Sequence, residues 1–169
     1  RSENARKLAL EQFAWTRAAE SLMDGIAKEK TLPKQFIDIL VDAPEHAECH
    51  LGPGAVLEQK FLCRMSGTEF IECRLATHGK QIGSPLHIEI ADDSGASIGL
   101  RKFEPDELAD NGWIRVDLPS GRARAGTTLV LRARSEDPSL SLWAARYVPY
   151  PLRPLSWNGT EIPWASLCL

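Results

Sequence analysis

The chain has 169 residues, a length that suits one ordinary domain with an appendage and would leave two full domains cramped. Its 20 basic and 23 acidic residues give a net charge of −3, so no overall positive field would recruit nucleic acid or anionic lipid. No apolar run approaches the roughly 18 residues that a membrane-spanning segment needs, and the first residues lack the order of a signal peptide.

The residue pattern predicts one N-terminal α-helix at residues 1–30. When residues are spaced at 3.6 per turn, one broad stripe holds Leu8, Gln12, Trp15, Ala19, Leu22, Met23 and Ile26, and charged residues occupy the opposite side. Pro33 lies just beyond the expected end of the helix. An isolated helix of this length is marginally stable in water, so we expect Trp15 to pack against another part of the protein.

A turn-rich linker at residues 31–50, with a possible first strand at residues 36–41, precedes the main domain at residues 51–169. Short strand patterns then recur, each followed by Gly, Pro, Asp or Asn, at residues 55–64, 69–77, 85–90, 96–103, 113–118, 127–135 and 139–148. This spacing predicts an all-β fold, namely an antiparallel two-sheet β-sandwich that is jelly-roll-like and preceded by one helix.

The alternation of apolar and polar residues assigns the faces of these strands. The residues expected to point inward are Ile71, Cys73, Leu75, Leu86, Ile88, Ile90, Ile114, Val116, Leu118, Leu129, Leu131 and Ala133. Two hairpin turns are predicted, one around Asp92, Asp93 and Gly95 and the other at Asn158 and Gly159.

The four cysteines, Cys49, Cys63, Cys73 and Cys168, form neither a C-x-x-C pair nor a cluster with histidine at zinc spacing. Cys63 and Cys73 lie in apolar strand patterns, which favour buried thiols over a disulfide. No metal or other cofactor is therefore expected, and a reducing cytoplasm is the predicted location.

The usual motifs of hydrolases, metalloproteases and nucleotide-binding enzymes are absent from the sequence. His87 alternates outward with Glu89, and His78 lies in a turn pattern, so a solvated surface role is favoured for both histidines. No catalytic residue is assigned, and the chain is predicted not to be an enzyme.

Outward positions offer two interpretations. Arg74, Arg132 and neighbouring charged residues could form cross-strand ion pairs, which is the favoured interpretation, or a polar groove that hydrogen-bonds sugar hydroxyls. Aromatic side chains that could stack on a sugar cluster near the C-terminus, and Trp143, Tyr147 and Trp157 are the candidates. Ordinary core packing remains the favoured interpretation of Trp143.

The segment "ARKLALEQFAWTRAAESLMDGI", residues 5–26, resembles the closing helix of bacterial nucleotide-sugar-dependent glycosyltransferases of the two-domain GT-B (group 1) type. The resemblance implies that residues 1–30 end an upstream catalytic domain of the same chain. Glu3 and Glu11 have the E-x7-E spacing that such enzymes use near the donor site, but the Gly-rich loop that accompanies it is absent, so helix surface is the favoured interpretation.

Most of residues 50–169, including "LADNGWIRVDLPS" and "SLWA", resembles carbohydrate-binding-like sandwich modules appended to bacterial polysaccharide-assembly proteins. The resemblance implies a non-catalytic C-terminal domain that binds a glycan acceptor during lipopolysaccharide or capsule biosynthesis. It also implies a cytoplasmic location, peripheral to the inner membrane through the parent protein. The alternative is a structural or oligomerisation module that binds protein, for example as a homo-oligomer.

Overall fold

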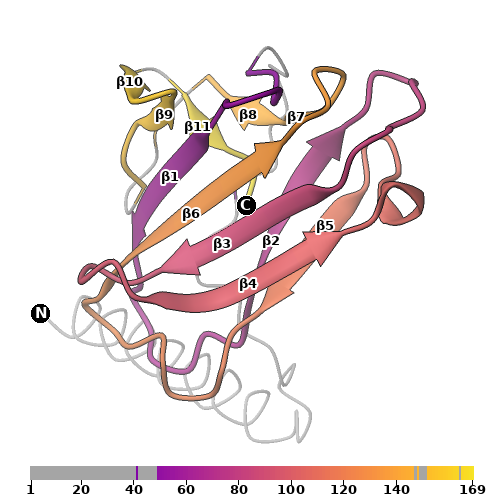
Figure 1. The fold of residues 1–169 in the computed structure, drawn as a ribbon. Coiled ribbons are helices and arrows are strands. Elements are labelled where there is room, and N and C mark those ends of the chain that lie inside the picture. The colour runs from indigo at the N-terminus through magenta and orange to yellow at the C-terminus, as the bar shows by residue number, and fades with distance from the viewer. Residues whose placement is uncertain (1–40, 42–48, 147, 149–151, 164) are drawn as a thin grey trace, which may run out of the picture. The chain divides into compact units, whose positions relative to one another are not determined.

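The computed structural model describes residues 41, 49–146, 148, 152–163 and 165–169, which belong to one compact unit, Ile37–Leu169. The predicted helix at residues 1–30, Trp15 and the candidate Tyr147 lie outside the described residues, as does most of the predicted linker. Within the described part the chain is almost entirely antiparallel β-structure (Figure 1). The predicted all-β class is therefore confirmed.

The larger sheet has six strands in the order β10-β9-β1-β6-β3-β4. Their bounds are β1 Leu57–Leu62, β3 Leu86–Ala91, β4 Ser97–Phe103, β6 Thr128–Ser135, β9 Leu155–Trp157 and β10 Thr160–Ile162. Both predicted hairpin turns are present, since β3 pairs with β4 and β9 pairs with β10. Gly95, Asn158 and Gly159 adopt the positive φ angles that these turns need.

The second layer is the three-stranded sheet β5-β2-β7, in which β2 is central. It consists of β2 Phe70–Ala76, β5 Trp113–Asp117 and β7 Ser141–Leu142, and the 3-10 helix η1 Pro105–Glu107 connects β4 to β5. In Figure 1 this layer lies behind β3, β4 and β6. The chain crosses between the two sheets from β1 to β2 and back to β3, then again from β4 to β5 and from β5 to β6.

One hydrophobic core fills the space between the sheets. All twelve residues expected to point inward are buried and belong to this core. The prediction holds because a strand places alternate side chains on opposite faces, and burying one face against a second sheet removes it from water.

The sheets approach closely where β4 passes β5. A Cβ atom added at Gly99 would lie 2.8 Å from Leu118 Cδ2 and 3.4 Å from Val116 Cγ1. Glycine at position 99 therefore lets the edge of one sheet pack directly on the end of the other.

The predicted strand at residues 139–148 is instead two short strands, β7 and β8 Ala144–Ala145. The break occurs at Trp143, whose N–H donates to Arg74 O at 2.9 Å and whose carbonyl accepts from Cys168 N at 2.9 Å. Before the break, β7 pairs with β2; after it, β8 pairs with the C-terminal strand β11 Ser166–Leu167.

Gln59 fastens the C-terminal segment to the larger sheet. Its side chain is fully buried, donates to Arg153 O at 2.6 Å and accepts from Leu167 N at 2.9 Å. Because these partners satisfy the amide, the buried polar group stabilises one arrangement of the C-terminal strands.

Candidate functional site

A row of three large side chains crosses the outer face of the three-stranded sheet, and we call it the Trp–Arg row: Trp113, Arg74 and Trp143. Arg74 on β2 is the register partner of Trp113 on β5, and Trp143 N donates to Arg74 O at 2.9 Å on the other side of β2. Directly opposed residues on neighbouring strands project from the same face of a sheet. The backbones of the two tryptophans therefore lie on either side of Arg74, about 10 Å apart at two strand spacings.

Asn111 holds this row in place. Its Oδ1 accepts the indole N–H of Trp143 at 2.9 Å, and its carbonyl oxygen accepts from Arg74 Nε at 3.4 Å. Asn111 has a φ of 59°, a left-handed conformation that asparagine tolerates better than most residues. One turn residue thus contacts two members of the Trp–Arg row.

Asp110 anchors the same turn to the end of β2. Its Oδ1 accepts from Thr77 N at 2.7 Å and from His78 N at 3.1 Å. The Thr77 hydrogen bond is the largest cause of the lowered pKa of Asp110, because an ionised carboxylate is the better acceptor. The turn that carries Asn111 is therefore held by the backbone N–H groups of Thr77 and His78, which follow β2.

The remainder of this face is occupied by its own internal contacts. Arg115 stacks on the Phe70 ring at 3.7 Å and pairs with Asp117 through Nε at 2.7 Å. The guanidinium of Arg115 is thus already engaged, whereas Trp113 is 41% exposed and Trp143 is partly exposed. Trp113 is the most exposed aromatic side chain among the described residues of this sheet.

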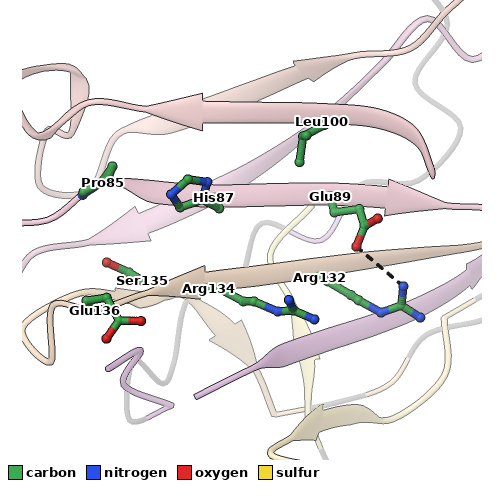
Figure 2. Close-up of a pocket in the computed structure, with 8 residues that line it drawn as sticks. All are labelled: Pro85, His87, Glu89, Leu100, Arg132, Arg134, Ser135 and Glu136. Carbon is green, nitrogen blue, oxygen red and sulfur yellow. Dashed lines mark ion pairs between the residues drawn. The ribbon is translucent and has the colours of Figure 1, made fainter. Parts of the chain in front are cut away.

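A hollow of about 410 Å³ lies on the opposite, outer face of the larger sheet (Figure 2), and we call it the β3–β6 hollow. Its lining residues come from β3 and the residue before it, from β4, and from β6 and the residue after it: Pro85, His87, Glu89, Leu100, Arg132, Arg134, Ser135 and Glu136. Leu100 is 71% exposed, which gives the hollow one apolar wall. Its size falls within the range of small-ligand sites.

Arg132 is the centre of an ion-pair network in this hollow. Its Nε donates to Glu58 Oε2 at 2.8 Å, and its Nη1 lies 3.6 Å from Glu89 Oε2. Partial burial opposes ionisation of Glu58, but the hydrogen bond from Arg132 and the charge of Lys60 outweigh it and lower the pKa of Glu58. Arg132 therefore forms the cross-strand ion pairs that the sequence favours for it.

The predicted candidates are divided between the two sheets. Arg74 and Trp143 come together, and Arg132 lies in the β3–β6 hollow. Trp157 is on β9 of the larger sheet, where its indole N–H donates to His50 O at 3.2 Å. Trp143 is only partly buried, so the core interpretation of this residue is wrong, because Leu140, Leu142 and Ala144 fill the inner face instead.

Trp113 is the member of the Trp–Arg row that the sequence patterns do not single out. It shares its parity on β5 with the outward residues Arg115 and Asp117, and this alternation was the available signal. Trp113 lies beside Arg74 because β5 pairs with β2. The residue pattern of one strand does not indicate which strands are its neighbours.

His78 and Ser141 form a second contact that the sequence did not indicate. His78 Nε2 lies 2.8 Å from Ser141 Oγ, and the His78 ring is 5.1 Å from the ring of His50. A serine beside an imidazole can be a nucleophile, but Ser141 is fully buried. The carboxylate of Asp110 binds the backbone of His78 and not its ring, so this pair satisfies a buried hydroxyl.

The described residues contain no group of three His, Cys, Asp or Glu side chains that could hold a metal ion. None of the four cysteines forms a disulfide there, and burial raises the pKa of the Cys73 thiol far above its usual range. No helix in this part of the chain is long and apolar enough to cross a membrane.

Comparison with known proteins gives no family for the chain. No family model matches the sequence. No curated protein matches it at a significant level either.

Proposed function

We propose that this chain is a non-catalytic carbohydrate-binding module and that the Trp–Arg row binds the glycan. The observation that carries the proposal is the placement of Arg74 between Trp113 and Trp143 on one exposed sheet face. Indoles offer flat apolar surfaces on which the apolar face of a sugar ring can stack. A guanidinium carries five N–H donors, a type of group that hydrogen-bonds sugar hydroxyls.

Preorganisation supports the same proposal. The Trp143 indole is held by Asn111, and the backbone of Trp143 is held by Arg74 and Cys168. Side chains that are already fixed lose little conformational entropy when a ligand binds. Because each contact between a protein and a sugar in water contributes little affinity, a rigid aromatic surface that loses little entropy on binding favours such a ligand.

The proposal extends to a parent protein. Attached to a bacterial glycosyltransferase of surface polysaccharide biosynthesis, the module would hold the acceptor glycan close to the active site. Such tethering raises the effective concentration of the acceptor without any new catalytic contact.

Calorimetric titration of residues 1–169 with a panel of bacterial polysaccharides tests the proposal. We expect one or more glycans to bind, and Trp113→Ala to weaken binding by about fivefold or more, because one stacking surface is lost. Arg74→Gln should weaken the same binding. Trp157→Phe is the matched control, because it alters an indole on the other sheet, and it should change the affinity by less than about twofold.

Light scattering distinguishes the glycan-binding proposal from the alternative, a structural or oligomerisation module that binds protein. A stable dimer that dissociates on Trp113→Ala, in a protein that binds no glycan of the panel, would identify the Trp–Arg row as a protein interface and refute the proposal.

A further inference from the structure

The β3–β6 hollow contains an arginine that is not used by the fold. Arg134 is exposed on β6 and makes no hydrogen bond or ion pair within the part of the chain that the structure describes. Its neighbour Arg132 differs, because two carboxylates, Glu58 and Glu89, already contact its guanidinium. One cation in the hollow is thus balanced, and the other is available to a ligand.

A carboxylate without a partner lies at the far end of the same hollow. Glu136 is exposed, lines the hollow, and forms no hydrogen bond or ion pair with other described residues. Figure 2 shows the Arg134 side chain running along the sheet towards Arg132 and away from Glu136. The hollow therefore offers one group of hydrogen-bond donors and one group of acceptors that do not satisfy each other.

Other polar and apolar groups complete the lining. His87 is the register partner of Arg134 across the β3–β6 ladder, so both side chains project from the same outer face. Leu100 and Pro85 add apolar surface at the edges. A ligand that fits this lining needs an anionic group, several hydroxyls and an apolar side.

We propose that the β3–β6 hollow is a second binding site, specific for a sugar residue that carries a carboxylate. The sugar carboxylate accepts two parallel N–H bonds from the Arg134 guanidinium, the geometry in which arginine binds carboxylates best. Sugar hydroxyls donate to Glu136, and a ring face lies against Leu100. This site does not depend on the Trp–Arg row, which lies on the opposite sheet of the sandwich.

The charge balance of the hollow argues against a small inorganic anion. Two arginines and two glutamates line it, and Glu58 also contacts Arg132, so the site has no net positive charge to attract phosphate from a distance. Binding must come from short-range contacts, and a phosphate ion has no hydroxyl-rich ring for Glu136 and Leu100. A sugar acid satisfies both ends of the hollow at once.

The test is a titration of residues 1–169 with galacturonate and glucuronate oligosaccharides, followed by NMR of the His87 amide and the Arg134 Nε–H. We expect at least one of the two acidic probes to shift both signals, and a neutral galactose oligosaccharide and inorganic phosphate to leave them in place. Arg134→Gln should weaken binding of the acidic probe by at least about tenfold, because hydrogen bonds to a charged group are lost.

Lys102→Gln is the matched control. Lys102 is the register partner of His87 on β4 and also projects outward, but it pairs with Glu104 at 2.6 Å and does not line the hollow. It should change the affinity by less than about twofold. The inference is overturned if neither acidic probe shifts the two signals, or if Arg134→Gln and Lys102→Gln have equal effects.

Trp113→Ala keeps the two proposals distinguishable. It should leave binding of the acidic probe unchanged, and Arg134→Gln should leave binding at the Trp–Arg row unchanged. A protein in which Trp113→Ala abolishes binding of the acidic probe has a single site on the smaller sheet, and the second site is then refuted.

Discussion

Trp143 and Asn111 are 32 positions apart in the sequence, yet the indole N–H of the first donates to the side-chain oxygen of the second at 2.9 Å. This bond joins the segment after β7 to the turn before β5, across the central strand β2. The bond fixes the orientation of the Trp143 indole. Asn111, which accepts it, also contacts Arg74 through its carbonyl oxygen.

Asn111→Gly tests this relationship. Glycine adopts a φ near 59° without strain, so the substitution removes the side-chain bonds and keeps the turn. We expect the free energy of unfolding to fall by about 1 kcal/mol. The indole N–H of Trp143 should exchange faster with solvent in NMR, and glycan affinity at the Trp–Arg row should fall.

Asn158→Gly is the control for that experiment. Asn158 also has a positive φ, and its Oδ1 accepts from Val56 N at 2.8 Å. A similar loss of stability is expected, but the Trp143 signal and the glycan affinity should stay unchanged. Equal effects of the two variants on glycan affinity would show that Asn111 has no particular role at the row.

Gln59→Leu tests the attachment of the C-terminal strands. Leucine fills a similar volume, but the N–H of Leu167 and the carbonyl of Arg153 lose their partner in a buried setting. We expect the free energy of unfolding, measured with urea, to fall by about 2 kcal/mol or more. Gln81→Leu, at an exposed glutamine, should change it by less than about 0.5 kcal/mol.

Glu58→Gln tests the ion-pair network around Arg132. The folded-state pKa of Glu58 lies below its ordinary value of 4.5, so the network stabilises the fold above that pH and is lost as the pH falls through the folded-state pKa. At pH 7 the variant should be less stable by about 1 kcal/mol. The difference from the unaltered protein should shrink below pH 4.5.

Urea unfolding at pH 7 and pH 3.5 measures this pH dependence. Glu161→Gln is the control, because Glu161 is exposed and forms no ion pair within the described residues. A stability difference for Glu58→Gln that is the same at both pH values would contradict the assignment of the network to this carboxylate.

The faces of the strands could be predicted from the sequence because alternation is a property of each strand alone. Ile71, Cys73 and Leu75 are buried on β2 without reference to any other strand, and the hairpin turns depend only on nearby residues. The same alternation places His87 and Glu89 on the outer face, where both line the β3–β6 hollow.

The two candidate sites could not be predicted because they depend on strand order and register. Arg74 adjoins Trp113 and Trp143 only because β2 lies between β5 and β7. The neighbours Arg134 and His87 are 47 positions apart, and they meet through the β3–β6 pairing. Clustering of aromatic residues near the C-terminus grouped Trp157 with Trp143, but Trp157 belongs to the other sheet.

NMR of the indole N–H signals during glycan titration tests the central claim most directly. The Trp–Arg row predicts that the signals of Trp113 and Trp143 shift together and saturate with one affinity. The signal of Trp157, which donates to His50 on the larger sheet, should stay in place. A shift of Trp157 alone, or no indole shift with any glycan of the panel, would contradict the account.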